Sequence, residues 1–349
     1  MSVKADAGGG VLRVGLVGAG GFGIEIAKMI ARLPELDLAG VADVDIAAAR
    51  ALGEEYGAPS WGDHAALLAE CKCAAVAVST PHNTHREIVV AAAVAGRHIF
   101  CEKAMAINVA ECHEMIRAAE ENDVKLMVAH KRRLRPTYAE IKRLLDGGEF
   151  GRPMAINVAG YFGRTLTGWW NSREACGGLI YWAGVHDIDT MRHLMGEVSR
   201  VHAVTGPKLY PDITDYEDSI AITLEFASGA AGSVQVSTFY PMATYRTSFD
   251  YEIVCENGGI AYDSRQVAIH SQLKDRPLAT TFFEGYGHDV AYDEEWSSFA
   301  GWVLRGEAPV LTGEDGLRCV EIMQAAYISV ANGAPVDLPL ATDDRRPWG

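Results

Sequence analysis

The sequence predicts a protein of two domains, an α/β domain with a parallel sheet followed by an α+β domain with a large, mostly antiparallel open sheet. The chain has 349 residues, and globular domains average about 150 residues. Its first part alternates short apolar runs with helical segments, which favours βαβ units. Its second part contains strand-like runs in succession, separated by turns, and this order is typical of an α+β domain.

The first part contains five short runs rich in apolar and β-branched residues. Such runs, separated by helices, are typical of parallel strands that are covered on both faces. The first intervening helix places Ile26, Ile30 and Leu33 on one buried stripe and is expected to end at Pro34. The predicted strands are 11–17, 38–42, 74–79, 98–101 and 125–129.

The second part is predicted to contain six strands and two helices. Turn-forming segments at 227–229 and 256–259 separate strand-like runs. One helix is expected within 178–195, and a second from about Thr312 to about Gly333, with acidic residues in its first turn. The predicted strands are 153–162, 198–205, 219–226, 230–238, 247–255 and 259–262.

The composition argues against several classes of protein. The chain has 31 Lys and Arg against 46 Asp and Glu, a net charge of −15, and so acidic a body repels nucleic acid and anionic membrane surfaces. No apolar run reaches the roughly 18 residues that a membrane span needs. The first ten residues lack the apolar stretch of a secretory signal. Seven scattered cysteines, an odd number, do not suggest a disulfide framework, so a cytoplasmic protein is expected.

The most specific local motif is a glycine-rich turn after the first strand. Residues 18–23 fit G-x-G-x-x-G between a strand and a helix. The first glycine allows a tight turn, the second lets backbone amides approach a pyrophosphate, and the third lets helix and strand pack closely. Asp43 follows 20 residues after the last glycine, the spacing of a carboxylate that accepts ribose hydroxyls. The motif predicts a dinucleotide site formed by Gly18, Gly20, Gly21, Phe22, Gly23 and Asp43.

The acidic residue also indicates which dinucleotide binds. Asp43, with Asp45 close behind it, would repel a ribose 2′-phosphate, and the nearest arginine that follows is Arg50. NAD is therefore favoured over NADP.

A second candidate cluster follows the later strands of the predicted parallel sheet. In open α/β sheets, ligands bind beyond the carboxyl ends of the strands. The segments 79–85, 102–103 and 130–133 each follow one strand. Lys103 at this edge can exchange a proton with a substrate oxygen if burial lowers its pKa. The alternative is a solvated Glu102–Lys103 pair at a strand end.

A third candidate cluster lies in the first helix of the second part. Gly177 and Gly178 precede an apolar helix that carries His186, and Asp189 follows three residues later on the same face. Histidine is the usual general base near neutral pH. The alternative is a core histidine with a structural role.

Aromatic residues just before this helix indicate the substrate class. Sugar rings carry C–H faces that pack on aromatic side chains, whereas their hydroxyls need polar partners. Packing in the core of the second domain is the alternative for each of these residues. Tyr161 is the first candidate, followed by Phe162, Trp169 and Trp170, with Arg164 and Arg173 beside them.

In their order and spacing, residues 18–23, Asp43, Glu102-Lys103 and the segment 177–189 resemble the glucose–fructose oxidoreductase/inositol dehydrogenase (Gfo/Idh/MocA) family. The resemblance covers about residues 11–335. It implies an N-terminal Rossmann domain and a C-terminal domain whose open sheet often forms oligomer contacts, hence a homodimer or homotetramer. It also implies NAD(P)-linked oxidation or reduction of a sugar or cyclitol hydroxyl, with the lysine and the histidine of these segments as catalytic residues.

The resemblance also implies domain boundaries and further contacts. We expect a flexible tail at 1–10, the Rossmann domain at 11–130, and a substrate-binding and oligomerisation domain at 131–335. The last helix can pack back on the Rossmann domain, and 336–349 form a C-terminal tail. Further cofactor contacts are expected from Thr80, Pro81, Asn83, His85, Glu102, Lys103 and Arg132. Substrate contacts are expected from Lys103, Tyr161, Trp170, Arg173, Trp182 and His186.

Two positions depart from the family pattern. Ala104 stands where many members have a proline after the lysine, so the family's turn geometry is not assumed here. Trp182 stands one helical turn before His186, where many members have an aspartate that orients the imidazole. Either Asp189 or a residue from elsewhere takes over that role, or Lys103 carries the proton transfer largely alone.

Together these features predict an NAD-dependent dehydrogenase that oxidises a hydroxyl of a sugar, sugar derivative or cyclitol. Hydride passes to nicotinamide, while Lys103 and His186 handle the proton. One alternative is a redox-neutral enzyme that cleaves a glycosidic bond through transient oxidation, because Trp182 replaces the usual acid. A non-catalytic NAD-binding regulator is a third possibility. No metal site is expected, because the histidine pairs lack a third ligand at a suitable spacing.

Overall fold

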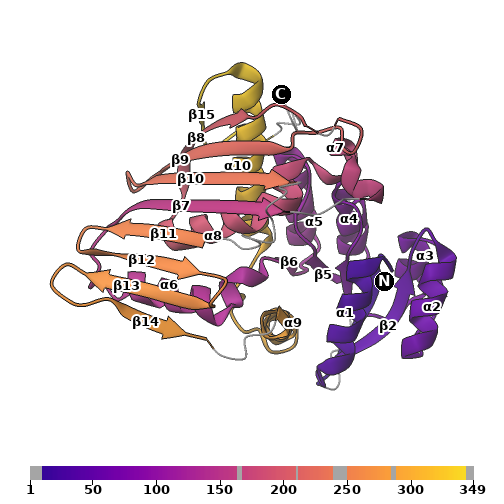
Figure 1. The fold of residues 1–349 in the computed structure, drawn as a ribbon. Helices are drawn as coiled ribbons and strands as arrows, with labels where there is room; N and C mark the ends of the chain where they lie inside the picture. The colour runs from indigo at the N-terminus through magenta and orange to yellow at the C-terminus, as the bar shows by residue number, and fades with distance from the viewer. Residues whose placement is uncertain (1–9, 163–166, 210, 239–249, 284–287, 343–349) are drawn as a thin grey trace. The chain divides into compact units, whose positions relative to one another are not determined.

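The computed structural model describes residues 10–162, 167–209, 211–238, 250–283 and 288–342 (Figure 1). The chain forms two compact units. The first consists of the described residues within 1–106, 110–130 and 289–317, and the second of those within 107–109, 131–288 and 318–349.

The first unit contains a six-stranded, fully parallel sheet with the strand order β3-β2-β1-β4-β5-β6. This order is that of a dinucleotide-binding α/β sheet. The strands are β1 (Leu12–Val17), β2 (Leu36–Ala42), β3 (Ser60–Trp61), β4 (Ala75–Val78), β5 (His98–Cys101) and β6 (Leu126–Val128). The helices are α1 (Gly21–Arg32), α2 (Ile46–Tyr56), α3 (His64–Glu70), η1 (His82–Thr84), α4 (His85–Val94), α5 (Val109–Glu121) and α9 (His288–Arg305).

Burial in the first unit follows the apolar pattern of the sequence. Val14 and Leu16 of β1 are completely buried, as expected for a strand that is covered on both faces. Ile26 and Ile30 of α1 are also completely buried, and the helix ends at Arg32. The α/β class predicted for this part is therefore confirmed.

The second unit contains a nine-stranded sheet with the order β14-β13-β12-β11-β7-β10-β9-β8-β15. Only the β7–β10 pair is parallel among these described strands. The strands are β7 (Pro153–Phe162), β8 (Val198–Thr205), β9 (Ser219–Phe226), β10 (Ala231–Thr238), β11 (Asp250–Cys255), β12 (Gly258–Asp263), β13 (Ala268–Leu273), β14 (Ala279–Phe282) and β15 (Val336–Asp337). The helices are η2 (Lys131–Leu134), α6 (Pro136–Asp146), η3 (Gly168–Asn171), α7 (Arg173–Cys176), η4 (Ile180–Gly184), α8 (Val185–Met195) and α10 (Gly313–Asn332).

One face of this sheet is buried and the other is open. In β9, Ile220, Ile222, Leu224 and Phe226 are buried, whereas the residues between them are exposed. Helices α6 and α8 pack against strands of the sheet (Figure 1). The strict alternation is that of an antiparallel sheet with one solvated face, and the predicted α+β class is confirmed.

The structure differs from the expected organisation in the last third of the chain. Helix α9 was not predicted, and residues 289–317 group with the first unit rather than with the second. Strands β13 and β14 were also not predicted. The expected C-terminal tail contains β15, which pairs with β8. The expected tail residues 1–9 and 343–349 lie outside the described part of the chain.

All seven cysteines are buried free thiols. None of the described helices combines the length and the apolar composition that crossing a bilayer needs.

Candidate active site

The glycine-rich turn joins β1 to α1, where the sequence predicts it. Gly18 has a φ of +105°, and a Cβ there would lie 2.1 Å from the carbonyl oxygen of Ser79, so only glycine fits. A Cβ at Gly23 would lie 1.9 Å from the carbonyl oxygen of Gly18. A Cβ at Gly20 would meet no atom within 4 Å. The space beside Gly20 is therefore open to a group that approaches the backbone at the start of α1, where the helix dipole favours an anion.

Asp43 lies beside this turn. Its Oδ2 accepts a hydrogen bond from the backbone N–H of Ala19 at 2.6 Å, and its Oδ1 accepts one from Asp45 at 2.8 Å. The Asp45 side chain instead caps the first turn of α2. Asp43 is therefore the acid that faces the glycine turn. Phe22 of the same turn is half-buried, and its ring centroid lies 5.7 Å from that of Tyr292.

The segment after β4 meets the same edge, because β1 and β4 are adjacent parallel strands. Thr80 and Pro81 are half-buried and Asn83 is exposed. His85 is completely buried, and its two ring nitrogens face the carbonyl oxygens of Thr80 and Ala104 at 2.9 and 3.0 Å. Backbone groups thus enclose both nitrogens, and the expected contact between His85 and a cofactor stays a prediction.

The next strand, β5, leads directly into Glu102 and Lys103. Glu102 is 8% exposed, and its Oε2 accepts the backbone N–H of Lys103 at 3.3 Å. Lys103 is half-buried, so the pair is not a freely solvated one. The Lys103–Ala104 peptide bond is cis, although no proline follows the lysine. Lys103 thus lies at the edge of the sheet that also carries the glycine turn.

His186 belongs to the second unit and is the second residue of α8, directly after the π-helical turn η4. Two glycines with positive φ, Gly177 and Gly178, precede that turn. A Cβ at Gly178 would lie 2.3 Å from the hydroxyl oxygen of Tyr327 in α10, so the start of the helix packs closely against its neighbour. His186 is half-buried, and its carbonyl oxygen accepts the Thr190 hydroxyl at 2.8 Å.

A buried carboxylate, Glu217, holds the start of this helix. It accepts the backbone N–H of Leu179 at 3.2 Å, the hydroxyl of Tyr327, and Nη2 of Arg173 at 2.7 Å. Burial raises the pKa of Glu217, and the charge of Arg173 opposes that shift. The Arg173 guanidinium thus neutralises a buried acid, and the substrate contact expected of this residue stays a prediction.

Arg132 forms a fully buried ion pair with Asp187, the residue after His186. Its Nη1 lies 2.6 Å from Asp187 Oδ1 and donates to the Tyr251 hydroxyl oxygen at 2.9 Å, while that hydroxyl donates to the same carboxylate at 2.6 Å. Burial raises the pKa of Asp187, and Arg132 opposes the shift. This side chain therefore neutralises an acid inside the second unit, and the cofactor contact expected of Arg132 stays a prediction.

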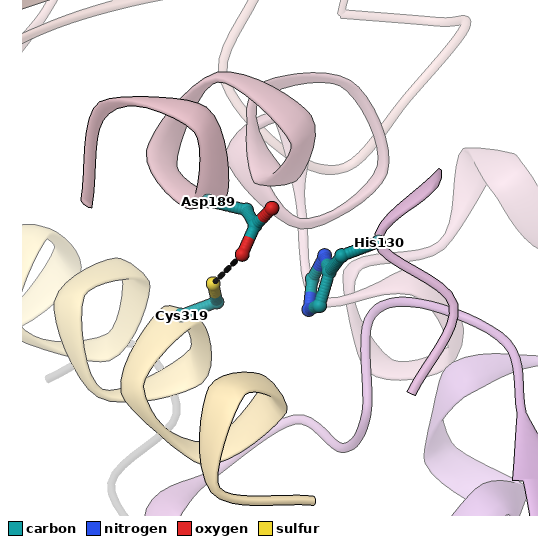
Figure 2. A group of neighbouring side chains, drawn as sticks. All are labelled: His130, Asp189 and Cys319. Atoms are coloured by element: carbon teal, nitrogen blue, oxygen red, sulfur yellow. Dashed lines mark hydrogen bonds between the residues drawn. The ribbon is translucent and has the colours of Figure 1, made fainter. Parts of the chain in front are cut away.

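Asp189 is bound by the next arginine of η2. Arg133 Nε and Nη2 lie 3.0 and 2.5 Å from the two carboxylate oxygens of Asp189, a bidentate pair. The Cys319 thiol of α10 donates to the same carboxylate at 3.7 Å (Figure 2). Arg133 therefore neutralises Asp189, and the alternative in which Asp189 orients His186 stays a prediction.

An aromatic group surrounds the position where the family pattern has an acid. The rings of Trp169 and Trp170 stack with centroids 3.8 Å apart, and Trp182 meets Trp170 edge-on at 6.1 Å. Trp182 is 8% exposed, whereas Trp169 and Trp170 are half-exposed. The side chains of residues 161–166, Tyr161 among them, lie outside the described part of the chain.

The roles of Arg133, Asp187 and Glu217 were not predicted from the sequence. The adjacent arginines and the alternating acids of α8 are visible in the sequence, and they are a signal for paired charges. Which arginine meets which acid depends on the packing of η2 against α8, across 55 and 56 positions, so the sequence alone does not reveal it.

Comparison with known proteins tests the resemblance directly. A model described as an oxidoreductase family with an NAD-binding Rossmann fold, GFO_IDH_MocA, matches residues 12–130, and a model of the GFO/IDH/MocA C-terminal domain matches residues 138–261. The chain belongs to the GFO/IDH/MocA oxidoreductase family. Residues 12–130 are the NAD-binding Rossmann domain of this family, and the predicted oxidoreductase class is confirmed.

Curated relatives match this family member over almost its whole length. The scyllo-inositol 2-dehydrogenase (NAD(+)) of Bacillus subtilis is 30% identical over 94% of this chain and 96% of its own. The inositol 2-dehydrogenase of Rhizobium meliloti is 29% identical over 94% of this chain and 99% of its own. A levoglucosan dehydrogenase structure with NADH and levoglucosan has a TM-score of 0.87 at 24% identity, covering 94% and 100% of the two chains. This structural likeness shows the shared fold.

Proposed function

We propose that this protein is an NAD-dependent dehydrogenase that oxidises a hydroxyl group of a sugar, sugar derivative or cyclitol. The position of Lys103 supports this most. It follows β5, and β1, β4 and β5 are adjacent parallel strands whose carboxyl ends carry the glycine turn and the Thr80 segment. An ammonium group at this edge can exchange a proton with a substrate oxygen. The relatives named as inositol and levoglucosan dehydrogenases agree with a polyol substrate.

The glycine turn fits a dinucleotide, because the space beside Gly20 is open and Asp43 faces the turn. The backbone amides of 20–23 would hold the pyrophosphate, and Asp43 would accept the ribose hydroxyls. Thr80, Pro81, Asn83 and Glu102 remain our candidates for the nicotinamide side. When bound, NAD supplies the hydride acceptor.

The Asp43 carboxylate gives this site its preference between the two coenzymes. Like charges placed together cost several kcal/mol, so NADH should bind at least about 10-fold more tightly than NADPH. Titration of the purified protein with each reduced coenzyme, followed by nicotinamide fluorescence, measures this ratio. Equal affinities would contradict the role of Asp43.

Lys103 and His186 are proposed to share the proton. One removes it from the hydroxyl while the carbinol hydrogen leaves as hydride, and the other polarises the forming carbonyl oxygen. Trp182 stands where many family members have an acid, and Asp189 is bound by Arg133. We therefore assign the greater share of the proton transfer to Lys103.

The aromatic side chains of Trp170 and Trp182 support a ring-shaped substrate with C–H faces. Trp170 is half-exposed and backed by the ring of Trp182, so it can offer a flat apolar surface. Tyr161 stays a candidate from the sequence.

Two measurements test the proposed function. An absorbance screen at 340 nm with NAD, against monosaccharides, anhydrosugars, glycosides and inositols, should identify at least one substrate. Lys103→Ala should then abolish turnover while NADH still binds, and Lys72→Ala, at an exposed lysine of the same unit, serves as the control. Retention of more than a few per cent of activity in Lys103→Ala would contradict the assignment.

The replacement of the acid by Trp182 supports one alternative, a redox-neutral enzyme that cleaves a glycosidic bond through transient oxidation. It predicts release of a sugar from a glycoside without accumulation of NADH at 340 nm. The dehydrogenase predicts NADH formation in proportion to product.

We further propose that the protein forms a homo-oligomer through the open face of the second sheet and acts in the cytoplasm. Met154, Val204, Val254 and Phe282 of that sheet are each more than half exposed, which supports an apolar contact between copies. The buried free thiols support a reducing compartment.

A further inference from the structure

His85 occupies an unusual position in the first unit. It begins α4 and is completely buried. Its Nδ1 lies 3.0 Å from the carbonyl oxygen of Ala104 and 3.3 Å from that of Met105, and its Nε2 lies 2.9 Å from that of Thr80. One imidazole ring therefore contacts two separate loops at the edge of the sheet where Lys103 lies.

The two loops are those that follow β4 and β5. Ala104 and Met105 come directly after Lys103, so the carbonyl groups that face Nδ1 belong to the turn that carries the lysine. The Thr80 loop in turn packs on the coenzyme turn, because a Cβ at Gly18 would lie 2.1 Å from Ser79 O and 3.2 Å from Thr80 Cγ2. A chain of close contacts thus runs from the lysine turn through the imidazole to the glycine turn.

The ring is held mainly through its Nδ1 side. Burial lowers the pKa of His85 to about 4, against the opposing effect of the three backbone carbonyl groups, and the charge of Lys103 lowers it further. A neutral imidazole has a single N–H to donate. Nδ1 faces two carbonyl oxygens and Nε2 faces one, so donation from Nδ1 satisfies more acceptors. The Cys101 thiol lies 3.6 Å from Nδ1, but it can donate instead to the carbonyl oxygen of Glu102 at 3.4 Å.

We propose that His85 is a positioning residue, which holds the Ala104–Met105 turn through Nδ1 and so fixes Lys103 relative to the coenzyme loops. The inference rests on the proposed role of Lys103 in proton transfer. Correct placement of reacting groups is worth much of a catalytic rate, and a misplacement of about 1 Å can cost on the order of 100-fold.

Three substitutions separate the contacts made by Nδ1 from those made by Nε2. His85→Leu removes both sets of contacts. His85→Asn keeps an amide donor near the place of Nδ1, and His85→Gln keeps one near the place of Nε2. We expect kcat to fall about 10- to 100-fold in His85→Leu and His85→Gln, with the Kd of NADH changed far less. His85→Asn should recover most of the lost kcat.

His98 provides a matched control. It begins β5, at the opposite end of the strand from Lys103, and burial lowers its pKa to about 4 as well. Its Nδ1 accepts the backbone N–H of Lys125 at 3.1 Å. His98→Leu should lower the melting temperature as His85→Leu does, but should leave kcat unchanged.

The Lys103 side chain can also be observed directly by NMR, without a measurement of turnover. The protein is reductively methylated with ¹³C-formaldehyde, and the Lys103 signal is assigned by comparison with Lys103→Arg. In His85→Leu the chemical shift and the titration midpoint of this signal should move, whereas in His98→Leu they should not. This readout stays valid if Lys103→Ala proves active, so failure of the proposed function and failure of the positioning role are distinguishable.

The positioning role is overturned if His85→Leu leaves both the Lys103 signal and kcat as in the wild type. It is also overturned if His85→Gln recovers kcat and His85→Asn does not, because the link through Nδ1 would then be irrelevant.

Discussion

At the scale of single residues, the three glycines of the coenzyme turn have different roles. Gly18 adopts a positive φ against the carbonyl of Ser79, and Gly23 leaves no room for a Cβ beneath the Gly18 carbonyl. Gly20 has open space beside it. Gly18 and Gly23 are therefore required by the fold of the turn, whereas Gly20 is required only if a ligand occupies that space.

This difference gives a direct prediction. Gly20→Ala should keep the melting temperature of the wild type within about 1 °C, since surface substitutions usually change stability little, and should weaken NADH binding. Gly23→Ala should lower both the melting temperature and the affinity for NADH. Thermal melts and fluorescence titrations of the two variants check this. A wild-type Kd for NADH in Gly20→Ala would show that the coenzyme does not approach the turn there.

Buried histidines make the stability of the protein depend on pH. Burial lowers the pKa of His85, His98 and His193 to about 4, from 6.5. The unfolded chain therefore binds more protons than the folded one between these values. The contribution of these neutral histidines to the free energy of unfolding is complete above pH 6.5. It is lost as the pH falls towards 4, by up to about 1.4 kcal/mol per pH unit for each histidine.

We accordingly expect the melting temperature to fall from pH 7 to pH 5. His98→Asn should show a shallower fall than the wild type, because one of the three groups is gone. Differential scanning calorimetry at several pH values measures both slopes. Parallel slopes for the two proteins would contradict a neutral buried His98.

At the scale of elements, two ion pairs bind η2 to α8. Arg132 meets Asp187 and Arg133 meets Asp189, and all four side chains are at least nine-tenths buried. Buried charges are costly to leave without a partner. Both acids lie within the first five residues of α8, so the helix that carries His186 cannot shift along η2 without breaking the two pairs.

Removal of one residue of a buried ion pair should therefore strongly destabilise the second unit. Arg132→Met leaves Asp187 buried without its cation and should destabilise the second unit by about 3–5 kcal/mol. Arg143→Met, which breaks an exposed pair with Glu140 on α6, should cost less than about 1 kcal/mol. Urea denaturation of both variants tests this. Similar losses in the free energy of unfolding for the two variants would show that the buried pair stabilises the protein no more than the exposed one.

The helices and strands also show how much of the fold can be predicted from the sequence. Strands such as β7, β8 and β9 have the predicted bounds, because alternation of apolar and polar residues is a local signal. The strands β13 and β14 were not predicted because their residues are largely polar or exposed. The pairings of Arg132 with Asp187 and of His85 with the Lys103 turn depend on tertiary packing, which no local pattern encodes.

At the scale of the whole molecule, the chain returns to its first unit late in the sequence. Helix α9 belongs with the Rossmann sheet, and its Trp296 stacks on Phe100 of β5 with ring centroids 4.0 Å apart. The sequence predicted the order of the two domains and a return by the last helix, but it did not predict α9, since a helix in this part of the chain can cover either sheet.

The open face of the second sheet leads to a prediction about assembly. Val254 is 52% exposed on this face, and Val94, in α4 of the first unit, is 69% exposed. If copies associate through the sheet, Val254→Glu should lower the mass measured by sedimentation velocity, and Val94→Glu should not. A wild-type protein that sediments as a monomer of 37.7 kDa would contradict the proposed assembly.

The burial of all seven cysteines has a practical consequence. Native thiols shielded in this way react slowly with maleimide dyes, so one introduced surface cysteine becomes the preferred point of attachment without removal of the others. Val94 and Leu209, which are 69% and 70% exposed in different units, are suitable positions. A donor and an acceptor fluorophore placed there would let single-molecule energy transfer measure the distance between the two labelled positions with and without coenzyme.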